Sequence, residues 1–278
     1  MARRRGSKLT IFILLVIISF ITYQFDLIPK ITSREKIDIT PELNPYCNTT
    51  TGSIKIANWN LQIFGEKKSS NQELMNTYSD LIKNYDIIFV QEIRDSSGQA
   101  FPKLCTMLPE YNCKISSPAG RSTSKEQYGI IYKKSIELTE FQDFNPDSQD
   151  RWERPPIKTV FLADGKLLTI YNIHAKPEDV KNELDYLQQI IPQTIEPVII
   201  LGDLNADCSY YSAEKETEFD SWKWVIKDTD DTTVSASDCA YDRIILDEDA
   251  QKFYKSNGIY KDIIEKQSDH YLVCVELK

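Results

Sequence analysis

The chain contains only two histidines, His174 and His270, and each stands at one end of an apolar segment. His174 closes LTIYNIH, and His270 opens HYLVCVEL directly after Asp269. A single histidine at such a place is usually an ordinary core or surface residue. Two of them, each with carboxylates available to orient the ring, indicate acid–base chemistry, because one imidazole can accept a proton while the other donates one.

Carboxylate and amide side chains stand at the ends of further apolar segments. A lone asparagine or aspartate there is usually a turn or cap residue, but several together indicate a site, since sites in α/β proteins gather at strand ends. Buried carboxylates cannot lie close together unless a cation joins them or some stay protonated. Oxygen ligands with few histidines favour Mg²⁺, Mn²⁺ or Ca²⁺ over zinc. The sequence therefore predicts a divalent-metal site among these residues: Asn60, Glu92, Asp203, Asn205, Asp242 and Asp269.

Hydrophobic periodicity predicts many strands with helices between them. Such a mixture is typical of an α/β layered domain whose sheets are covered by helices. No internal boundary is visible between residues 53 and 278. The predicted strands cover 53–60, 86–93, 126–134, 157–164, 166–175, 197–206, 241–249 and 270–277, and the predicted helices cover 71–86, 100–108 and 177–191.

A separate segment precedes this domain. Three consecutive arginines near the start are followed by the apolar run 9–25, a pattern typical of a signal peptide or a signal anchor. No small-residue cleavage site follows, which favours an uncleaved anchor. The expected organisation is a signal or anchor over 1–25, a proline-containing linker over 26–52 and one domain over 53–278. That domain is expected to be secreted, periplasmic or membrane-anchored on the non-cytoplasmic side.

The composition agrees with export and with cation binding. Six cysteines in an exported chain favour disulfides over a metal site, because no C-x-x-C spacing is present and histidines are too few for zinc. The net charge of −9 argues against non-specific, charge-driven binding to nucleic acid. It suits a protein whose acidic residues hold divalent cations.

In chain order, the motifs NWN, QE, GDLNADCSYY, CAYDRII and SDH resemble those of the deoxyribonuclease I family, within the broader endonuclease/exonuclease/phosphatase superfamily. GDLNADCSY and CAYDRI carry the resemblance to the deoxyribonuclease I branch, and it covers residues 53–277. It implies a four-layer α/β sandwich, in which two packed, mixed and mostly antiparallel sheets are flanked by helices. It also implies a metal-dependent endonuclease that hydrolyses phosphodiester bonds of double-stranded DNA.

The resemblance assigns the metal ligands. Asn60 and Glu92, with help from Asp269, are expected to contact Mg²⁺ or Mn²⁺. A second loop, DTTVSAS, keeps Asp231 and Thr233 of a family calcium site, so Ca²⁺ is expected to assist. The alternative is that DTTVSAS is an ordinary polar surface loop that binds no calcium.

The resemblance also implies a catalytic group of two histidine–carboxylate pairs and two phosphate-binding residues. One histidine takes a proton from water and the other gives one to the leaving 3′-oxygen, with His270 expected as the base and His174 as the acid. Each ring needs a carboxylate to fix its tautomer and raise its basicity. The implied set is His174 with Glu126, His270 with Asp242, and Asp203 and Asn205 holding the scissile phosphate and the attacking water.

The implied DNA contacts are Arg154 to a phosphate and Arg94 in the minor groove. Three positions depart from the family pattern. Ser124 replaces a tyrosine that stacks on a DNA sugar, and Gln62 replaces an arginine, so cleavage preference is open. Pro155 replaces an acidic residue after the key arginine, which puts one family calcium site in doubt.

One disulfide, Cys208 with Cys239, follows from the resemblance. The other cysteines fall outside the family pattern, and six cysteines allow 15 connectivities. The expected additional pairs are Cys105, in a predicted helix, with Cys113 at the next strand, and Cys47, in the predicted linker, with Cys274.

Two other functions compete with the nuclease. The same chemistry could act on a lipid or inositol phosphate, which a membrane anchor would suit, but NADCSY and CAYDRI favour the nuclease. A non-enzymatic binding module is disfavoured, because a decayed enzyme would be expected to lose one of the site residues, and all are present. DNA is the expected partner, together with the membrane if the N-terminal segment is uncleaved; the sequence identifies no protein partner.

Overall fold

The computed structural model describes residue 47 and residues 52–193, 196–212 and 215–278. These residues belong to one compact unit, Leu43–Lys278. The expected anchor and most of the expected linker lie outside the described residues, so the division of the chain at 25 and 52 stays a prediction. Within the part that is described, no helix is both long and apolar enough to cross a membrane.

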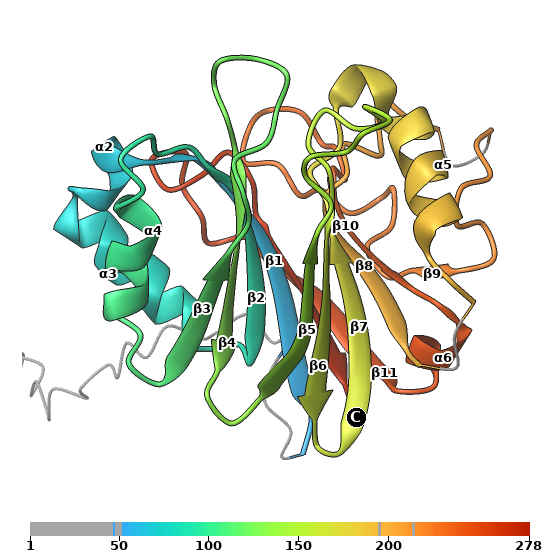
Figure 1. Ribbon diagram of the computed structural model, residues 1–278, viewed down its shortest axis with the longest axis horizontal. Helices are drawn as coiled ribbons and strands as arrows, with labels where there is room; N and C mark the ends of the chain where they lie inside the picture. Colours follow the sequence, from blue (N-terminus) through green and yellow to red (C-terminus); the bar gives the residue numbers. More distant parts are fainter. Residues whose placement is uncertain (1–46, 48–51, 194–195, 213–214) are drawn as a thin grey trace, which may run out of the picture. The chain divides into compact units, whose positions relative to one another are not determined.

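Two six-stranded sheets form the body of this unit (Figure 1). In the first sheet, β1 and β2 run parallel and every other neighbouring pair is antiparallel. In spatial order its strands are β11 (Tyr254–Tyr260), β12 (Leu272–Leu277), β1 (Ile54–Phe64), β2 (Ile87–Ile93), β4 (Gln127–Lys133) and β3 (Tyr111–Ile115).

The second sheet has the same kind of pairing. β7 and β8 run parallel, and the other neighbouring pairs are antiparallel. In spatial order its strands are β5 (Glu137–Asp143), β6 (Ile157–Ala163), β7 (Lys166–Asn172), β8 (Val198–Asp203), β10 (Asp242–Leu246) and β9 (Lys223–Trp224).

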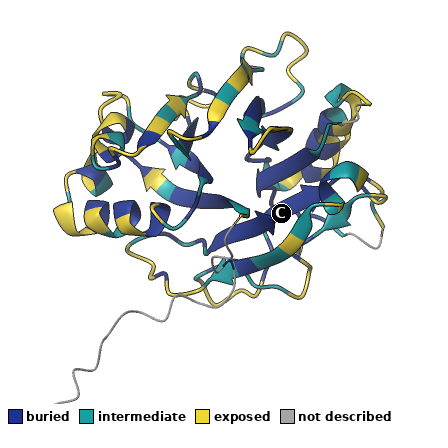
Figure 2. Ribbon diagram, turned by 90° about the horizontal axis from the view of Figure 1, so that it is seen from below, coloured by how far each residue is buried: buried dark blue, intermediate teal, exposed yellow. Residues whose placement is uncertain are grey.

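The two sheets bury apolar side chains against each other. Ile56 and Phe89 of the first sheet share one buried cluster with Phe161, Ile170 and Leu201 of the second. The rings of Phe89 and Phe161 meet edge to face with their centroids 6.5 Å apart. Central strands are buried on both faces (Figure 2), which is why their sequences are continuous apolar runs rather than alternating patterns.

Helices cover the outer face of the first sheet. α3 (Gln72–Ile82) begins after Asn71, whose side chain accepts the N–H of Leu74 and so satisfies one free donor of the first turn. It buries Leu74, Tyr78 and Ile82 against this face, beside α2 (Glu66–Ser69) and α4 (Ala100–Thr106).

The outer face of the second sheet is covered in the same way. A 3₁₀ turn at Pro177–Asp179 leads into α5 (Val180–Ile190), which packs Val180, Leu184 and Leu187 on the sheet (Figure 1). The order helix, sheet, sheet, helix confirms the predicted four-layer sandwich.

The predicted strand ranges lack β3, β5, β9 and β11, although a strand is expected at Cys113, which lies in β3. The predicted helices lack the short α2 and α6 (Glu248–Gln251). Each of these four strands lies at the edge of its sheet. β5 reads ELTEFQD and has no buried residue. An edge strand is half solvated and carries polar side chains, so it lacks the apolar run by which the central strands are found.

All three expected disulfides are present. Cys208 bonds to Cys239, Cys105 to Cys113, and Cys47 to Cys274, with sequence separations of 31, 8 and 227 residues. The last of these ties the predicted linker to β12 in the first sheet.

Loss of the Cys208–Cys239 bond is expected to destabilise the domain more than loss of Cys105–Cys113. Closing the longer loop removes more entropy from the unfolded chain, about 3.7 kcal/mol against about 2.6 kcal/mol. Urea unfolding of C208A/C239A and of C105A/C113A measures both free energies. A larger loss for C105A/C113A would contradict this expectation.

Candidate active site

The residues that could do chemistry meet at one edge of the sandwich. β1 and β2 are parallel, so Asn60 and Glu92 reach this edge near the ends of their strands. Asp203 ends β8, and Asp242, its register partner, begins the antiparallel β10. The Nδ2 of Asn60 donates to Oδ2 of Asp203 at 2.9 Å, and this hydrogen bond joins the two sheets.

Each histidine is held by one carboxylate through Nδ1. His174 Nδ1 lies 2.9 Å from Oε2 of Glu126, and His270 Nδ1 lies 2.7 Å from Oδ2 of Asp242. All four side chains are buried. Because the carboxylate occupies Nδ1, each ring presents Nε2 to the edge of the sandwich.

Asp203 lies between the two imidazoles. Its Oδ2 is 3.4 Å from Nε2 of His174 and 3.5 Å from Nε2 of His270. The preceding Gly202 has φ +151°, and a Cβ there would lie 1.8 Å from the carbonyl oxygen of Ile173. Glycine is therefore required where β8 closes on the segment that carries His174.

The charges of this cluster shift its pKa values. Burial raises the pKa of Asp203, but the charges of His270 and His174 outweigh burial and leave it below its ordinary value. For His270, burial lowers the pKa, yet Asp242 and Asp203 outweigh that effect and raise it to about 10. These charges stabilise the protonated imidazole of His270 and the ionised carboxylate of Asp203. The expected roles of His270 as base and His174 as acid stay a prediction.

Left-handed backbone shapes the site at Gln62 (φ +44°), Ile63 (+53°), Glu92 (+57°) and Asn205 (+48°). Non-glycine residues adopt this conformation rarely and at a cost, above all a β-branched residue such as Ile63. The first two of these residues form a bulge in β1, where its pairing with β2 shifts register between Asn60 and Phe64. The bulge directs the N–H of Gln62 to Oδ1 of Asn60 at 2.8 Å and the N–H of Ile63 to Oε2 of Glu92 at 2.9 Å. The strain thus orients two of the expected metal ligands.

Both expected DNA-contacting arginines bind Glu126. Arg94 Nε lies 3.2 Å and Arg154 Nη1 lies 3.4 Å from Oε1 of Glu126, whose other oxygen holds His174. Burial raises the pKa of Glu126, but the hydrogen bond and charge of His174, the charge of Arg154 and a hydrogen bond from Arg94 lower it to about 2. The two arginines therefore adjoin the His174–Glu126 pair.

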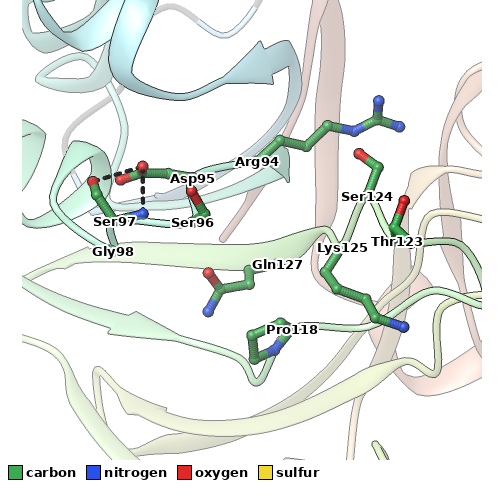
Figure 3. Close-up of a pocket in the computed structure, with 10 residues that line it drawn as sticks. All are labelled: Arg94, Asp95, Ser96, Ser97, Gly98, Pro118, Thr123, Ser124, Lys125 and Gln127. Atoms are coloured by element: carbon green, nitrogen blue, oxygen red, sulfur yellow. Dashed lines mark hydrogen bonds between the residues drawn. The ribbon is translucent and has the colours of Figure 1, made fainter.

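A pocket of about 590 Å³ opens beside Arg94 (Figure 3). The Arg94 guanidinium extends toward Ser124, away from the turn in which Ser97 donates two hydrogen bonds to Asp95. Lys125 adds a second cation to the lining. Ser124 stands where the family resemblance leads one to expect a tyrosine, so its small side chain leaves this space open.

A buried amide network beneath the site was not among the predicted residues. Asn58 donates to Oδ1 of Asp242 at 3.4 Å, and its own Oδ1 accepts from Gln91 at 2.5 Å and from Asn172 at 3.2 Å. The sequence signal was available: Asn58 lies two residues before Asn60 in an apolar strand, so the two amides share one face.

The expected metal ligands offer oxygen donors, which are the kind that Mg²⁺ prefers. Asn60 Nδ2 lies 3.2 Å from Oε1 of Glu92, and Asp269 has a buried Oδ1 without a hydrogen-bond partner in the described part of the chain. Among the described residues no group of three or more His, Cys, Asp or Glu side chains is placed so that it could hold a metal ion. One or two carboxylates, completed by water and substrate, are the set that Mg²⁺ uses in phosphoryl-transfer sites.

The expected calcium residues also lie together. Oδ1 of Asp231 accepts both the N–H of Thr233 at 2.9 Å and its hydroxyl at 3.0 Å. The other oxygen of Asp231 is 3.7 Å from Nζ of Lys261. The carboxylate is thus engaged on both sides, and calcium binding at this loop stays a prediction.

Residues 57–270 match the model of the Endonuclease/Exonuclease/phosphatase family. The chain belongs to this family. Within it, the chain is 33% identical over 261 residues to Deoxyribonuclease-1 of Sus scrofa, covering 81% of this chain and 92% of that protein. It is 31% identical to Deoxyribonuclease-1 of Homo sapiens, with 81% and 93% covered. The predicted deoxyribonuclease I branch is thereby confirmed, and so is the predicted class, a phosphodiesterase-type hydrolase.

Solved structures of other proteins share the fold. A family protein from Bacteroides vulgatus superposes with a TM-score of 0.62 at 21% identity, covering 81% of this chain and 98% of that one. A mannosyl-6-phosphatase from Bacteroides thetaiotaomicron VPI-5482 gives 0.62 at 17% identity, with 81% and 99% covered. At these identities the likeness shows the four-layer architecture alone.

The lowered pKa of Glu126 predicts acid-sensitive stability. A carboxyl whose pKa falls from 4.5 to about 2 on folding stabilises the protein above pH 4.5 and loses this contribution as the pH drops through 2. The shift corresponds to roughly 3 kcal/mol. The difference in free energy of unfolding between wild type and Glu126→Gln is expected to be largest near pH 7 and to shrink toward pH 2.

Urea unfolding in EDTA, repeated at each pH, measures this difference. Glu73→Gln is the matched control, because Glu73 is 80% exposed and pairs with Lys266 at the surface. A pH-independent difference for Glu126→Gln would contradict the assignment.

Proposed function

We propose that the chain is a metal-dependent endonuclease that hydrolyses phosphodiester bonds of double-stranded DNA by histidine–carboxylate acid–base catalysis. The observation that carries the proposal is the convergence of both Nε2 atoms on one carboxylate oxygen of Asp203. Hydrolysis of a phosphodiester needs one group to take a proton from water and another to give one to the leaving oxygen. Two oriented imidazoles about one point supply both.

The paired carboxylates keep the rings in the required state. Glu126 and Asp242 bind Nδ1, so the proton that moves is carried at Nε2 of His174 or His270. Asn205 donates its amide to the carbonyl of Ala175 at 3.0 Å. That contact fixes Asn205 at the same edge as Asp203, where the two are proposed to hold the phosphate and the attacking water.

Asn60, Glu92 and Asp269 are the residues proposed to hold Mg²⁺ or Mn²⁺. When bound, the ion supplies positive charge to the phosphoryl oxygens. It also reduces the repulsion between an acidic protein and negatively charged DNA, because a divalent cation neutralises the carboxylates that face the substrate. Ca²⁺ at Asp231 and Thr233 is proposed as an assisting ion.

DNA as substrate is supported by the relatives named Deoxyribonuclease-1 and by the arginines beside the site. Arg154 and Arg94 are proposed to contact the DNA backbone and the minor groove. The three disulfides support export, since such bonds persist in oxidising compartments. Secreted, periplasmic and anchored locations remain alternatives within that proposal.

Plasmid nicking tests the chemistry. Residues 40–278 are expected to convert supercoiled plasmid to open circles with Mg²⁺ or Mn²⁺, and to lose this activity in excess EDTA. His174→Ala and His270→Ala are each expected to reduce the rate by about 10²-fold or more, as removal of a general acid or base does.

The comparison variant is Lys103→Ala, which removes an amine that donates to the carbonyl of Ser69 in the helical layer. It should cut at the wild-type rate. Full nicking in EDTA, or a loss below about 10-fold in both histidine variants, would rule out the proposed mechanism. Hydrolysis of a lipid or inositol phosphate in preference to plasmid would support the alternative substrate.

A further inference from the structure

Glu183 is a buried carboxylate on α5 that takes no part in the proposed reaction. Its side chain is 0% exposed. Oε1 accepts the backbone N–H of Glu153 at 2.6 Å, and Oε2 accepts the backbone N–H of Lys176 at 3.0 Å. An apolar side chain is the ordinary choice on the inner face of a helix, and burying a carboxylate is costly unless strong hydrogen bonds offset the cost.

The two amides belong to segments that are far apart in sequence and carry site residues. Glu153 immediately precedes Arg154. Lys176 closes the segment that begins with His174 and Ala175. One oxygen of Glu183 therefore binds the backbone next to Arg154, and the other binds the segment that carries His174.

Direct contacts show what this arrangement aligns. Arg154 Nε donates to the carbonyl of His174 at 2.9 Å, and Nη2 donates to the carbonyl of Ala175 at 3.1 Å. Asn205 donates to the same carbonyl of Ala175. The alignment of the guanidinium thus depends on the spacing between the two segments that Glu183 holds.

A further bond fixes the helix itself to the arginine segment. Trp152, which is 1% exposed, donates its Nε1–H to the backbone carbonyl of Glu183 at 2.9 Å. Glu183 therefore holds two consecutive residues of that segment. Its backbone carbonyl binds the side chain of Trp152, and its carboxylate binds the backbone of Glu153.

We propose that Glu183 is a positioning residue that sets the Arg154 guanidinium against the His174–Lys176 segment by binding one backbone amide from each side. The inference rests on the proposed function, in which Arg154 contacts a DNA phosphate. A carboxylate is required because two N–H donors need two acceptors, whereas glutamine offers one acceptor and turns an NH₂ group toward the other donor.

The first test is a double-mutant cycle on plasmid cleavage. Glu183→Gln is expected to lower kcat/KM by about 10-fold or more, because small displacements of a substrate-holding group are costly. If the loss acts through Arg154, the double variant E183Q/R154Q cuts no worse than R154Q alone, within about 2-fold. Multiplying effects in the double variant, or an unchanged rate in E183Q, would overturn the proposal.

The second test separates positioning from a general loss of stability. Binding of a duplex oligonucleotide is followed by fluorescence anisotropy at several salt concentrations, in an inactive His270→Ala background. Loss of one phosphate contact lowers the slope of log K against log salt by about 1. E183Q and R154Q are both expected to show this change, and an unchanged slope in E183Q would contradict the proposal even if its affinity fell.

Glu218→Gln is the matched control. Glu218 is also buried and binds Nζ of Lys181 on α5 at 2.8 Å and the hydroxyl of Tyr211 at 3.2 Å, but it touches neither segment. Its salt slope should equal that of wild type, and a change equal to that of E183Q would overturn the proposal. If E183Q does not fold, Glu183→Asp keeps the charge and withdraws it by one methylene, so it can hold at most one amide and should show the same loss of slope.

The outcomes remain distinguishable from those of the proposed function. A wild-type protein that binds the duplex but does not cut it would contradict the nuclease, while the salt slopes would still judge the role of Glu183. An active wild type with a full slope in both Glu183 variants would contradict only the positioning role.

Discussion

The site depends on one constraint: the carboxylate of Asp203 must lie within reach of two imidazoles that come from different sheets. His174 follows β7 of the second sheet, and His270 precedes β12 of the first. Their Nε2 atoms lie 3.4 and 3.5 Å from the same oxygen. The sandwich must therefore close with its two sheets in one relative position, and the apolar layer between them, with Phe89 against Phe161, provides that closure.

The same closure places polar groups where water is scarce, and most of them are hydrogen-bonded there. Amide side chains supply some of these hydrogen bonds: Asn58 accepts one from Gln91 and donates one to Asp242. Arg94 and Arg154 donate others to Glu126. Among the described residues, Gln91 Oε1 and Asn172 Oδ1 are buried without a hydrogen-bond partner. The hydrogen bonds of the Asn58 network restrict the rotamers of the side chains that make them. Rigid, pre-oriented rings are what acid–base catalysis requires.

Two features differ from the pattern that the family resemblance leads one to expect. The pocket beside Arg94 is lined by Ser124, and the bulged end of β1 presents Gln62 and an exposed Ile63 in left-handed conformation. Contacts to the groove of a nucleic acid must therefore differ in detail from those of a protein with tyrosine and arginine at these positions. All members of the proposed catalytic group are present and lie together. The departures from the family pattern therefore concern the proposed DNA contacts and not the proposed chemistry.

The sequence by itself determined the central strands, the layered fold class, the pairs around His174 and His270, and the Cys208–Cys239 pair. These were readable because apolar runs mark buried strands, and because family motifs attach to single positions such as Asp203 in GDLN. The other two cysteine pairs were expected from the sequence, but the structure decided them among 15 connectivities. Only the tertiary structure showed the edge strands, the hydrogen-bond network around Asn58 and the two backbone amides that Glu183 binds. Edge strands carry no apolar run, and a buried amide or carboxylate looks like any polar residue until distant segments bring its partners to it.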